Sequence, residues 1–364
     1  MATKRRFMNP ATAQIIATAV AFPQYHYPQS ELSGQLRQVW KKRGLHTDVF
    51  DRITENLLVE SRYLSRPKEF YLNVPGFAAR NQIWKEEALP LGKSCIQDLL
   101  RQSELQAGDV QQIVTSTVTG IAVPSLDALL MNQLPFSSQL KRVPMFGLGC
   151  LAGTAGVARV ADYLKGHPQD AAILLSVELC SLTFQLHDLS IANVIASQLF
   201  GDGAAAVLMV GQAHPLADSK YPRIIDSRSI FFPHTEEVMG WKISDRGFEI
   251  VLNSGVPEFA EKHIKPAMDQ FLGQQDLNIS DITHWIAHPG GPKVLQAMEQ
   301  GLGLDSHDLK ISWESLKKVG NLSSSSVLMI LNEFMAHNQP QAGSYGLMIS
   351  FGPGFCAELV LLKW

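Results

Sequence analysis

Cys150, His288 and Asn321 are the residues whose types and sequence settings favour chemistry at a shared site. Cys150 lies in FGLGCLAGTAGVARVADYL, where a Gly-rich turn runs into a helix whose first two turns carry almost nothing larger than leucine. Unpaired N–H groups and the helix dipole at that end stabilise a thiolate, and the small neighbours leave room for a ligand. An arbitrary cysteine is more often a buried small hydrophobe. The two downstream residues favour a nucleophile instead.

A nucleophilic thiol needs a partner that holds its proton, and acyl chemistry needs donors for a developing oxyanion. His288 follows the apolar stretch HWIA and precedes PGGP, so we expect it at the C-terminal end of a strand, where open α/β sheets bind ligands. Asn321 follows Gly320 and opens LSSSSVLMI. Its amide can donate to an oxyanion, and asparagine after glycine is also an ordinary N-cap. Each residue alone would be interpreted as structural.

Composition bounds the function. The chain has 364 residues, 46% hydrophobic and 18% charged, which is enough for a large core in one big domain or two fused ones. Its net charge of -3 comes without a basic stripe, which argues against nucleic-acid binding. Four scattered cysteines without CxxC or histidine at ligand spacing argue against a zinc site and a disulfide framework, and fit a reduced, cytosolic compartment. The apolar run QIIATAVAFP is too short for a membrane span or a signal sequence, so we expect it to be the first strand.

Helical and strand patterns alternate along the chain. The pattern predicts helices, the first of them in pieces, at residues 35–62, 86–105, 124–134 and 150–164, and strands at residues 14–23, 110–120, 143–149, 170–181 and 200–211. In the second of these helices, Ala88, Leu91, Cys95 and Leu99 share one face at period 3.6. This alternation predicts an α/β sheet with helices on both faces.

The second half repeats the order of the first. FGDGAAAVLMV from Phe200 aligns with FGPGFCAELVL from Phe351, sharing Phe, Gly, Gly, Ala and Leu at the same offsets. In the same pairing, Asn321 corresponds to Cys150, each opening a turn-then-helix unit. We therefore predict two similar halves, residues 1–215 and 216–364, divided near the polar stretch 211–222, with two helix N-termini directed to one site.

Five motifs in order resemble the type III polyketide synthases, the chalcone and stilbene synthase family, over nearly the whole chain. They are GCLAG at Cys150, LFGDGAAAV at Phe200, WIAHPGGPKVL at His288, GNLSS at Asn321 and FGPG at Phe351. The resemblance implies a thiolase-type αβαβα layered sandwich and a homodimer, in agreement with the duplicated halves.

The resemblance also implies roles. Cys150 would hold the starter acyl group and the growing chain as a thioester. His288 would form an ion pair with its thiolate and, together with Asn321, stabilise the enolate left when malonyl-CoA loses CO2. Phe200 and Phe248 would be the aromatic pair that favours loss of a carboxylate in apolar surroundings. CoA thioesters are the substrates, and no metal or redox cofactor is implied.

Several positions depart from the plant pattern. Arg52 stands where the family has a basic residue at the CoA tunnel mouth, whereas the nearby family lysines appear as Val49 and Asn56. A weaker phosphate clamp leaves open an acyl carrier protein as the starter donor, and Lys293 is a candidate compensating cation. The FGPG loop, whose Gly352 and Pro353 are expected among the substrate-binding residues, follows Ser350 in place of the plant glycine.

The segments VELCSLTFQ and TGIAVPSLDA resemble the bacterial branch that makes alkylresorcinols and alkylpyrones from long acyl starters. That resemblance predicts a deep apolar tunnel with Cys180 and Thr183 along it, and Val123 reaching the partner subunit's cavity. The hydroxyl network for aldol closure would use Glu178 and Ser323, but Val118 stands where a hydroxyl or thiol is expected, which favours lactonisation.

Three alternatives remain open at this stage. A 3-oxoacyl-acyl-carrier-protein synthase III-like ketoacyl synthase shares the order Cys, His, Asn but would carry HQAN and NTS in place of HPGGP and NLSS. A papain-like protease would show Trp after its cysteine and a secretion signal. A non-catalytic dimer of the same fold would leave Cys150 merely buried.

Overall fold

The computed structural model describes residues 12–253 and 255–364. Its α-helices are α1 (Gln29–Lys41), α2 (Thr47–Leu57), α3 (Phe77–Ser103), α4 (Leu126–Met131), α5 (Ala152–Gly166), α6 (Ile191–Leu199), α7 (Val256–Gly273), α8 (Pro292–Leu302), α9 (Lys310–Val319) and α10 (Ser324–His337). Its strands are β1 (Ala13–Ala21), β2 (Tyr25–Pro28), β3 (Ser61–Leu64), β4 (Gln112–Ser116), β5 (Lys141–Met145), β6 (Ala171–Leu179), β7 (Asp202–Gly211), β8 (Arg223–Phe231), β9 (Met239–Ser244), β10 (Gly247–Leu252), β11 (Ile282–Ala287), β12 (Tyr345–Gly352) and β13 (Cys356–Lys363).

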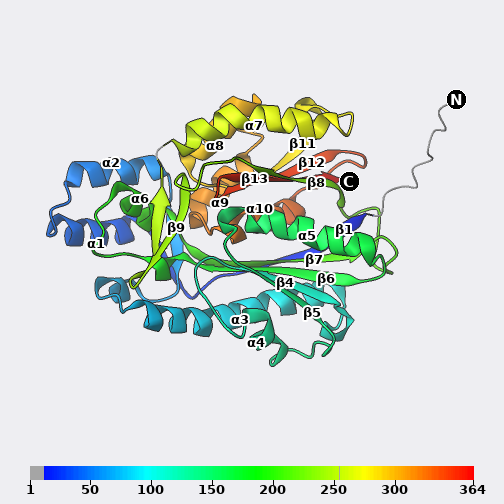
Figure 1. Cartoon of the computed structure of the whole chain (residues 1–364), viewed down its shortest axis with the longest axis horizontal. Helices are drawn as coiled ribbons and strands as arrows, with labels where there is room; N and C mark the ends of the chain where they lie inside the picture. Colours follow the sequence, from blue (N-terminus) through cyan, green and yellow to red (C-terminus); the bar gives the residue numbers. More distant parts are fainter. Residues whose placement is uncertain (1–11, 254) are drawn as a thin grey trace.

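These elements form five alternating layers of helix and sheet (Figure 1). α3 and α4 pack on the outer face of β1, β4, β6 and β7, while α7, α8 and α9 pack on the outer face of β11, β12 and β13. α5 and α10 lie in the middle, in a core to which all of these strands contribute side chains. The expected thiolase-like αβαβα sandwich is confirmed.

The strands run in the order β11-β12-β13-β8-β1-β7-β6-β4-β5. Only two residue pairs join β1 to β8, so the sheet consists of two parts with a narrow connection. Each part has antiparallel and parallel pairs, the parallel ones being β11 with β12, β4 with β5 and β4 with β6. β5 is an edge strand at one end of this order.

The central helices approach each other closely because small residues face one another. A Cβ on Gly153 of α5 would lie 2.3 Å from the carbonyl oxygen of Ser324 at the start of α10, so only glycine fits there. Ser324, Ser325 and Ser326 are all fully buried. This contact brings the turns before both helices together.

Elements predicted for the first half of the chain are present. QIIATAVAFP forms β1, and Ala88, Leu91, Cys95 and Leu99 of α3 are all buried. The sequence analysis did not identify β8 to β10, whose half-exposed strands carry weak alternation. Within the described ranges, no helix is both long enough and apolar enough to span a membrane.

Candidate active site

Cys150, His288 and Asn321 line one buried cavity although they are far apart in the sequence. Cys150 lies in a short 3-10 helix, Gly149–Leu151, directly before α5; His288 follows β11, and Asn321 lies between α9 and α10. Phe200, Pro353 and Ser323 belong to the same lining. The topology therefore assembles the predicted constellation.

The Cys150 thiol is buried, and its Sγ lies 3.6 Å from the Ser323 hydroxyl. Burial raises the pKa of Cys150 to about 12; the Ser323 hydrogen bond opposes this change, and the charge of Glu178 adds to it. The start of α5 supplies the positive end of a helix dipole, as the sequence predicted. The desolvation of the thiolate is a cost that the sequence did not reveal.

The imidazole of His288 is the basic side chain in the lining of the cavity. Its backbone N–H donates to the Ile349 carbonyl at 2.8 Å, which fixes the residue at the end of β11 beside β12. Both ring nitrogens are buried without a hydrogen-bond partner among the residues that the structure describes. Burial lowers the pKa of His288 to about 3, so its imidazole alone is neutral at pH 7. A neutral imidazole can take the thiol proton, after which each charge stabilises the other.

Asn321 is held by contacts at both ends. Its backbone N–H donates to the Leu199 carbonyl at 2.9 Å, and its carbonyl accepts from the Gly201 N–H at 3.0 Å. Its Oδ1 accepts from the Ser323 N–H at 2.7 Å, while Nδ2 donates to the Gly290 carbonyl at 3.2 Å. Because Oδ1 is occupied, the donor end of the amide faces the turn after His288, as an oxyanion site requires.

Gly320 allows the backbone to place Asn321 in this position. It has φ +72, and a Cβ there would lie 2.4 Å from the Leu199 carbonyl oxygen. A side chain would thus meet both backbone strain and a clash.

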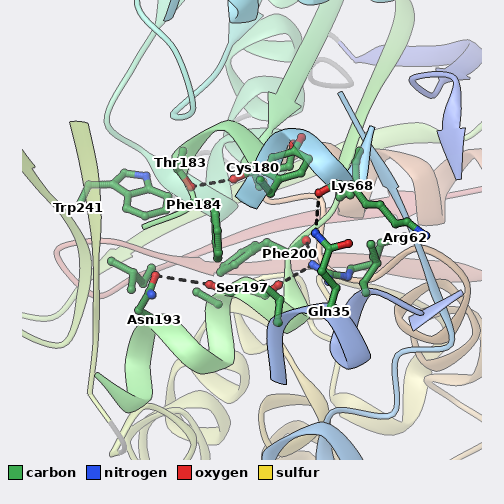
Figure 2. Close-up of a pocket in the computed structure, with 17 residues that line it drawn as sticks. Gln35, Arg62, Lys68, Cys180, Thr183, Phe184, Asn193, Ser197, Phe200 and Trp241 are labelled. Atoms are coloured by element: carbon green, nitrogen blue, oxygen red, sulfur yellow. Dashed lines mark hydrogen bonds between the residues drawn. The ribbon is translucent and has the colours of Figure 1, made fainter. Parts of the chain in front are cut away.

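Phe200 lines both the catalytic cavity and a second cavity, and Figure 2 shows it among the residues that line the second one. Its carbonyl accepts from the Arg62 guanidinium at 2.7 Å, and that buried arginine also donates to the Ser197 carbonyl at 2.9 Å. Burial lowers the pKa of Arg62 to about 10, which leaves it charged at pH 7.

The structure places Phe248 in an opening beside the catalytic cavity rather than in the lining of that cavity. Phe248 packs against Phe77, Phe146 and Trp241, outside the lining of the catalytic cavity. Ile250, on the same face of β10, lines it instead, directly opposite Trp241 of β9. Alternation along the strand makes Phe248 and Ile250 equivalent in the sequence, and only the position of the β9–β10 hairpin distinguishes them.

The Glu178 network also differs from the expected one. Ser324, not Ser323, donates its hydroxyl to Glu178, and further donors are Thr119 Oγ1 at 2.8 Å, the Val118 N–H at 3.1 Å and Thr117 Oγ1 at 3.3 Å. Consecutive serines at the start of a helix point in different directions, so the sequence motif alone could not tell which one reaches Glu178.

Cys180 and Thr183 lie in the second cavity, where Thr183 Oγ1 donates to the Cys180 carbonyl at 2.8 Å (Figure 2). Four residues line both cavities, which therefore adjoin: Cys180, Phe200, Trp241 and Ile250. Leu32, Leu36, Leu64, Tyr71 and Phe184 give the second cavity apolar walls. The sequence analysis did not identify Trp241 or Ile250.

A surface groove of about 570 Å³ is lined by the two cationic side chains expected near the CoA phosphates. Arg52, Asn56 and Lys293 line it, together with Leu199 and Val294, which also line the catalytic cavity. The structure thus brings Arg52 and Lys293 to one approach to the site.

The remaining expected residues fall into two groups. Pro353 lines the catalytic cavity and packs against Gly149, and Gly352 packs against Leu151, so the FGPG loop supports the turn of the nucleophile. Val123 is 96% exposed and does not line the catalytic cavity. Among the described residues, no group of three or more His, Cys, Asp or Glu side chains could hold a metal ion.

If His288 takes the thiol proton, His288→Ala will raise the apparent pKa of Cys150. Loss of a neighbouring cation disfavours the thiolate, so the pH midpoint of iodoacetamide modification will rise by about one to three units. Peptide-level mass spectrometry would follow Cys150 alone. His284→Ala, in β11 shortly before His288 but packed against Phe334 and Trp364, is the control. An unchanged midpoint in His288→Ala contradicts the ion pair.

Comparison with known proteins identifies the family. Residues 2–214 match "Chalcone and stilbene synthases, N-terminal domain", and residues 223–364 match the C-terminal domain of that family. A 1,3,6,8-tetrahydroxynaphthalene synthase of Streptomyces peucetius subsp. caesius is 41% identical over 96% of this chain and 93% of its own length. A putative chalcone synthase of Bacillus subtilis (strain 168) is 34% identical over 97% and 99%.

Solved structures agree with this assignment. The crystal structure of 1,3,6,8-tetrahydroxynaphthalene synthase from Streptomyces coelicolor A3(2), titled a bacterial type III polyketide synthase, has a TM-score of 0.91 at 30% identity. The match covers 96% of this chain and 99% of that one. The chain therefore belongs to the chalcone and stilbene synthase family and is a type III polyketide synthase, an acyltransferase-class enzyme that carries out decarboxylating condensation.

Proposed function

We propose that this enzyme loads a long-chain acyl starter on Cys150, extends it iteratively with malonyl-CoA and cyclises it to an alkylpyrone or alkylresorcinol. The observation that carries the starter class is the apolar second cavity, which adjoins the catalytic one across Phe200. Its polar members are largely paired within the protein: Asn193 with the Gln185 and Asp188 carbonyls, and Thr183 with the Cys180 carbonyl. Such a wall suits an alkyl chain better than a polar starter.

In the loading step, the Cys150 thiolate attacks the carbonyl carbon of the starter thioester. The carbon–sulfur bond to the donor breaks, and the departing thiol takes the proton that His288 held. The groove at Arg52 and Lys293 supplies two cations for the phosphates of CoA or of a carrier-protein arm. The starter donor is thus an acyl-CoA or an acyl carrier protein.

In the extension step, malonyl-CoA loses CO2, and the electron pair of that bond forms an enolate. Asn321 Nδ2 and the N–H of the His288 imidazole, which is neutral after the loading step, would donate to its oxygen. The enolate carbon then attacks the acyl-Cys150 carbonyl, which forms a carbon–carbon bond and releases the thiolate. Every step is redox-neutral, so the CoA thioesters suffice without a metal or redox cofactor.

We favour lactonisation for ring closure. Three side chains donate hydrogen bonds from their hydroxyls to Glu178: Thr117, Thr119 and Ser324. All three lie outside the lining of the catalytic cavity, whereas the apolar Val118 lies within it. An enol oxygen of the chain attacking its own thioester carbonyl then gives a pyrone and frees the thiol.

A second product class has its own support. The relative at 41% identity bears the name of 1,3,6,8-tetrahydroxynaphthalene, a compound without an alkyl chain. A chain built without a long starter is therefore the alternative, and a single condensation of the ketoacyl-synthase type is a further outcome.

The four free cysteines, Cys95, Cys150, Cys180 and Cys356, support a reducing, cytoplasmic location.

A substrate panel tests the proposal. The purified enzyme receives malonyl-CoA with acetyl-, hexanoyl-, lauroyl- or palmitoyl-CoA or the matching acyl carrier proteins, and mass spectrometry identifies the products. We expect alkylpyrones from the long starters and no extended product from Cys150→Ala. Naphthalene products from malonyl-CoA alone would support the alternative, and a single β-ketoacyl product would point to a ketoacyl synthase.

The second cavity makes a separate prediction about chain length. Ala196→Phe places a ring in that cavity, so turnover of palmitoyl-CoA will fall about tenfold or more because the chain is displaced. Acetyl-CoA turnover by the same variant is the internal control and will stay near that of the wild type. Equal losses with both starters would refute the assignment of this cavity.

We also propose a homodimer formed along β5. This edge strand is exposed, and Val143, Phe146, Ile121 and Val123 expose apolar side chains beside it. Unpaired strand edges and apolar patches of this kind bind further protein. An opening lined by Phe146, Ile243 and Trp241, which adjoins the catalytic cavity, could receive the partner's Val123.

Sedimentation equilibrium will test this interface. The wild type should sediment as a dimer, and Val143→Asp should shift it toward monomer because a carboxylate at the edge would be buried without a partner. Ile191→Asp, at an exposed site on α6, is the control. A monomeric wild type contradicts the proposal.

A further inference from the structure

Ser323 has a positive backbone φ, which an N-cap residue does not need. It is the N-cap residue of α10, with φ +50 and ψ −128, a backbone region that favours glycine. A serine at an N-cap ordinarily accepts a hydrogen bond from the helix N–H groups, yet the Ser323 side chain caps nothing here. Its strained backbone and unused cap point to another task.

Backbone carbonyls accept the helix N–H groups that the Ser323 side chain leaves uncapped, including the Ser325 N–H, which donates to the Leu322 carbonyl at 3.1 Å. The Ser326 hydroxyl accepts from the Leu322 N–H at 2.7 Å, and the Ser326 N–H donates to the Ser323 carbonyl at 3.2 Å. The Ser323 N–H is held by Asn321 Oδ1. These bonds hold the residue in its positive-φ conformation and leave its hydroxyl for Cys150 Sγ, 3.6 Å away in the same cavity.

The surroundings of the thiol supply few other donors. The titratable side chains in the cavity lining are Cys150, Cys180 and His288, and Glu178 lies beyond the Val118 N–H that it accepts from. Glu178 and Cys180 offer the thiolate no positive charge. Once His288 has turned to the substrate oxyanion, a hydroxyl is the remaining side-chain donor that the structure places against the sulfur.

We propose that Ser323 is a further catalytic residue: its hydroxyl donates a hydrogen bond to the Cys150 thiolate in the free enzyme and again whenever condensation releases the thiolate. In the thiol form the direction reverses, and Sγ–H donates to the Ser323 oxygen. Asn321 then has two tasks, since its Oδ1 positions Ser323 while its Nδ2 faces the substrate. The inference rests on the proposed role of Cys150 as nucleophile.

The test measures the thiol without substrate. Ser323→Ala and Ser323→Gly both remove the hydroxyl, but glycine also relieves the strain at φ +50. If the hydroxyl stabilises the thiolate, the pH midpoint of Cys150 modification by iodoacetamide will rise by about one to two units in both variants, since a hydrogen bond to a charged group is lost. The turnover number should fall about tenfold at pH 7 with little change in KM.

Ser325→Ala is the matched control. Its hydroxyl is equally buried but bonds to Ser176 and the Gly203 carbonyl, away from the cavity, so its midpoint should match that of the wild type. A midpoint unchanged in both Ser323 variants overturns the inference, as does a change in the alanine variant alone, which would indicate strain. Failure of the proposed function would appear separately, as a wild type that makes no polyketide.

Discussion

The close contact between α5 and α10 is the constraint on which the rest of the site depends. Gly153 packs on the Ser324 carbonyl, so the turn that carries Cys150 and the turn that carries Asn321 and Ser323 meet at one cavity. Any side chain at residue 153 would push the two helices apart. The small residues after Cys150 and the buried serines after Asn321 are complementary surfaces of this one contact.

Burial makes this chemistry both difficult and selective. An apolar cavity favours loss of a carboxylate from malonyl-CoA, but it also raises the pKa of Cys150 and lowers that of His288, both away from the ion pair. The site opposes these shifts with the start of α5, with proton transfer between the two side chains and with the Ser323 hydroxyl. Activation of the nucleophile is thus shared among several elements.

Much of the fold and part of the site could be predicted from local patterns. Periodicity located β1 and the buried face of α3, and the duplicated turn-then-helix units related Cys150 to Asn321. The structure differs from the expected placement between near neighbours: Ile250 rather than Phe248 lines the catalytic cavity, and Ser324 rather than Ser323 donates to Glu178. A one-residue or two-residue difference changes which cavity a side chain meets, and no local pattern records that difference.

The layered α/β architecture and the family could be inferred from the chain alone, and so could the proposal of Cys150, His288 and Asn321 as nucleophile, base and amide donor, because these depend on motifs and on periodicities of 3.6 and 2. Tertiary structure alone decided which hydroxyl reaches Cys150, which wall separates the two cavities and how Arg52 and Lys293 share one groove. Cys150 and Ser323, like Arg52 and Lys293, lie more than a hundred residues apart in the chain, so their approach depends on the packing of layers rather than on any local segment.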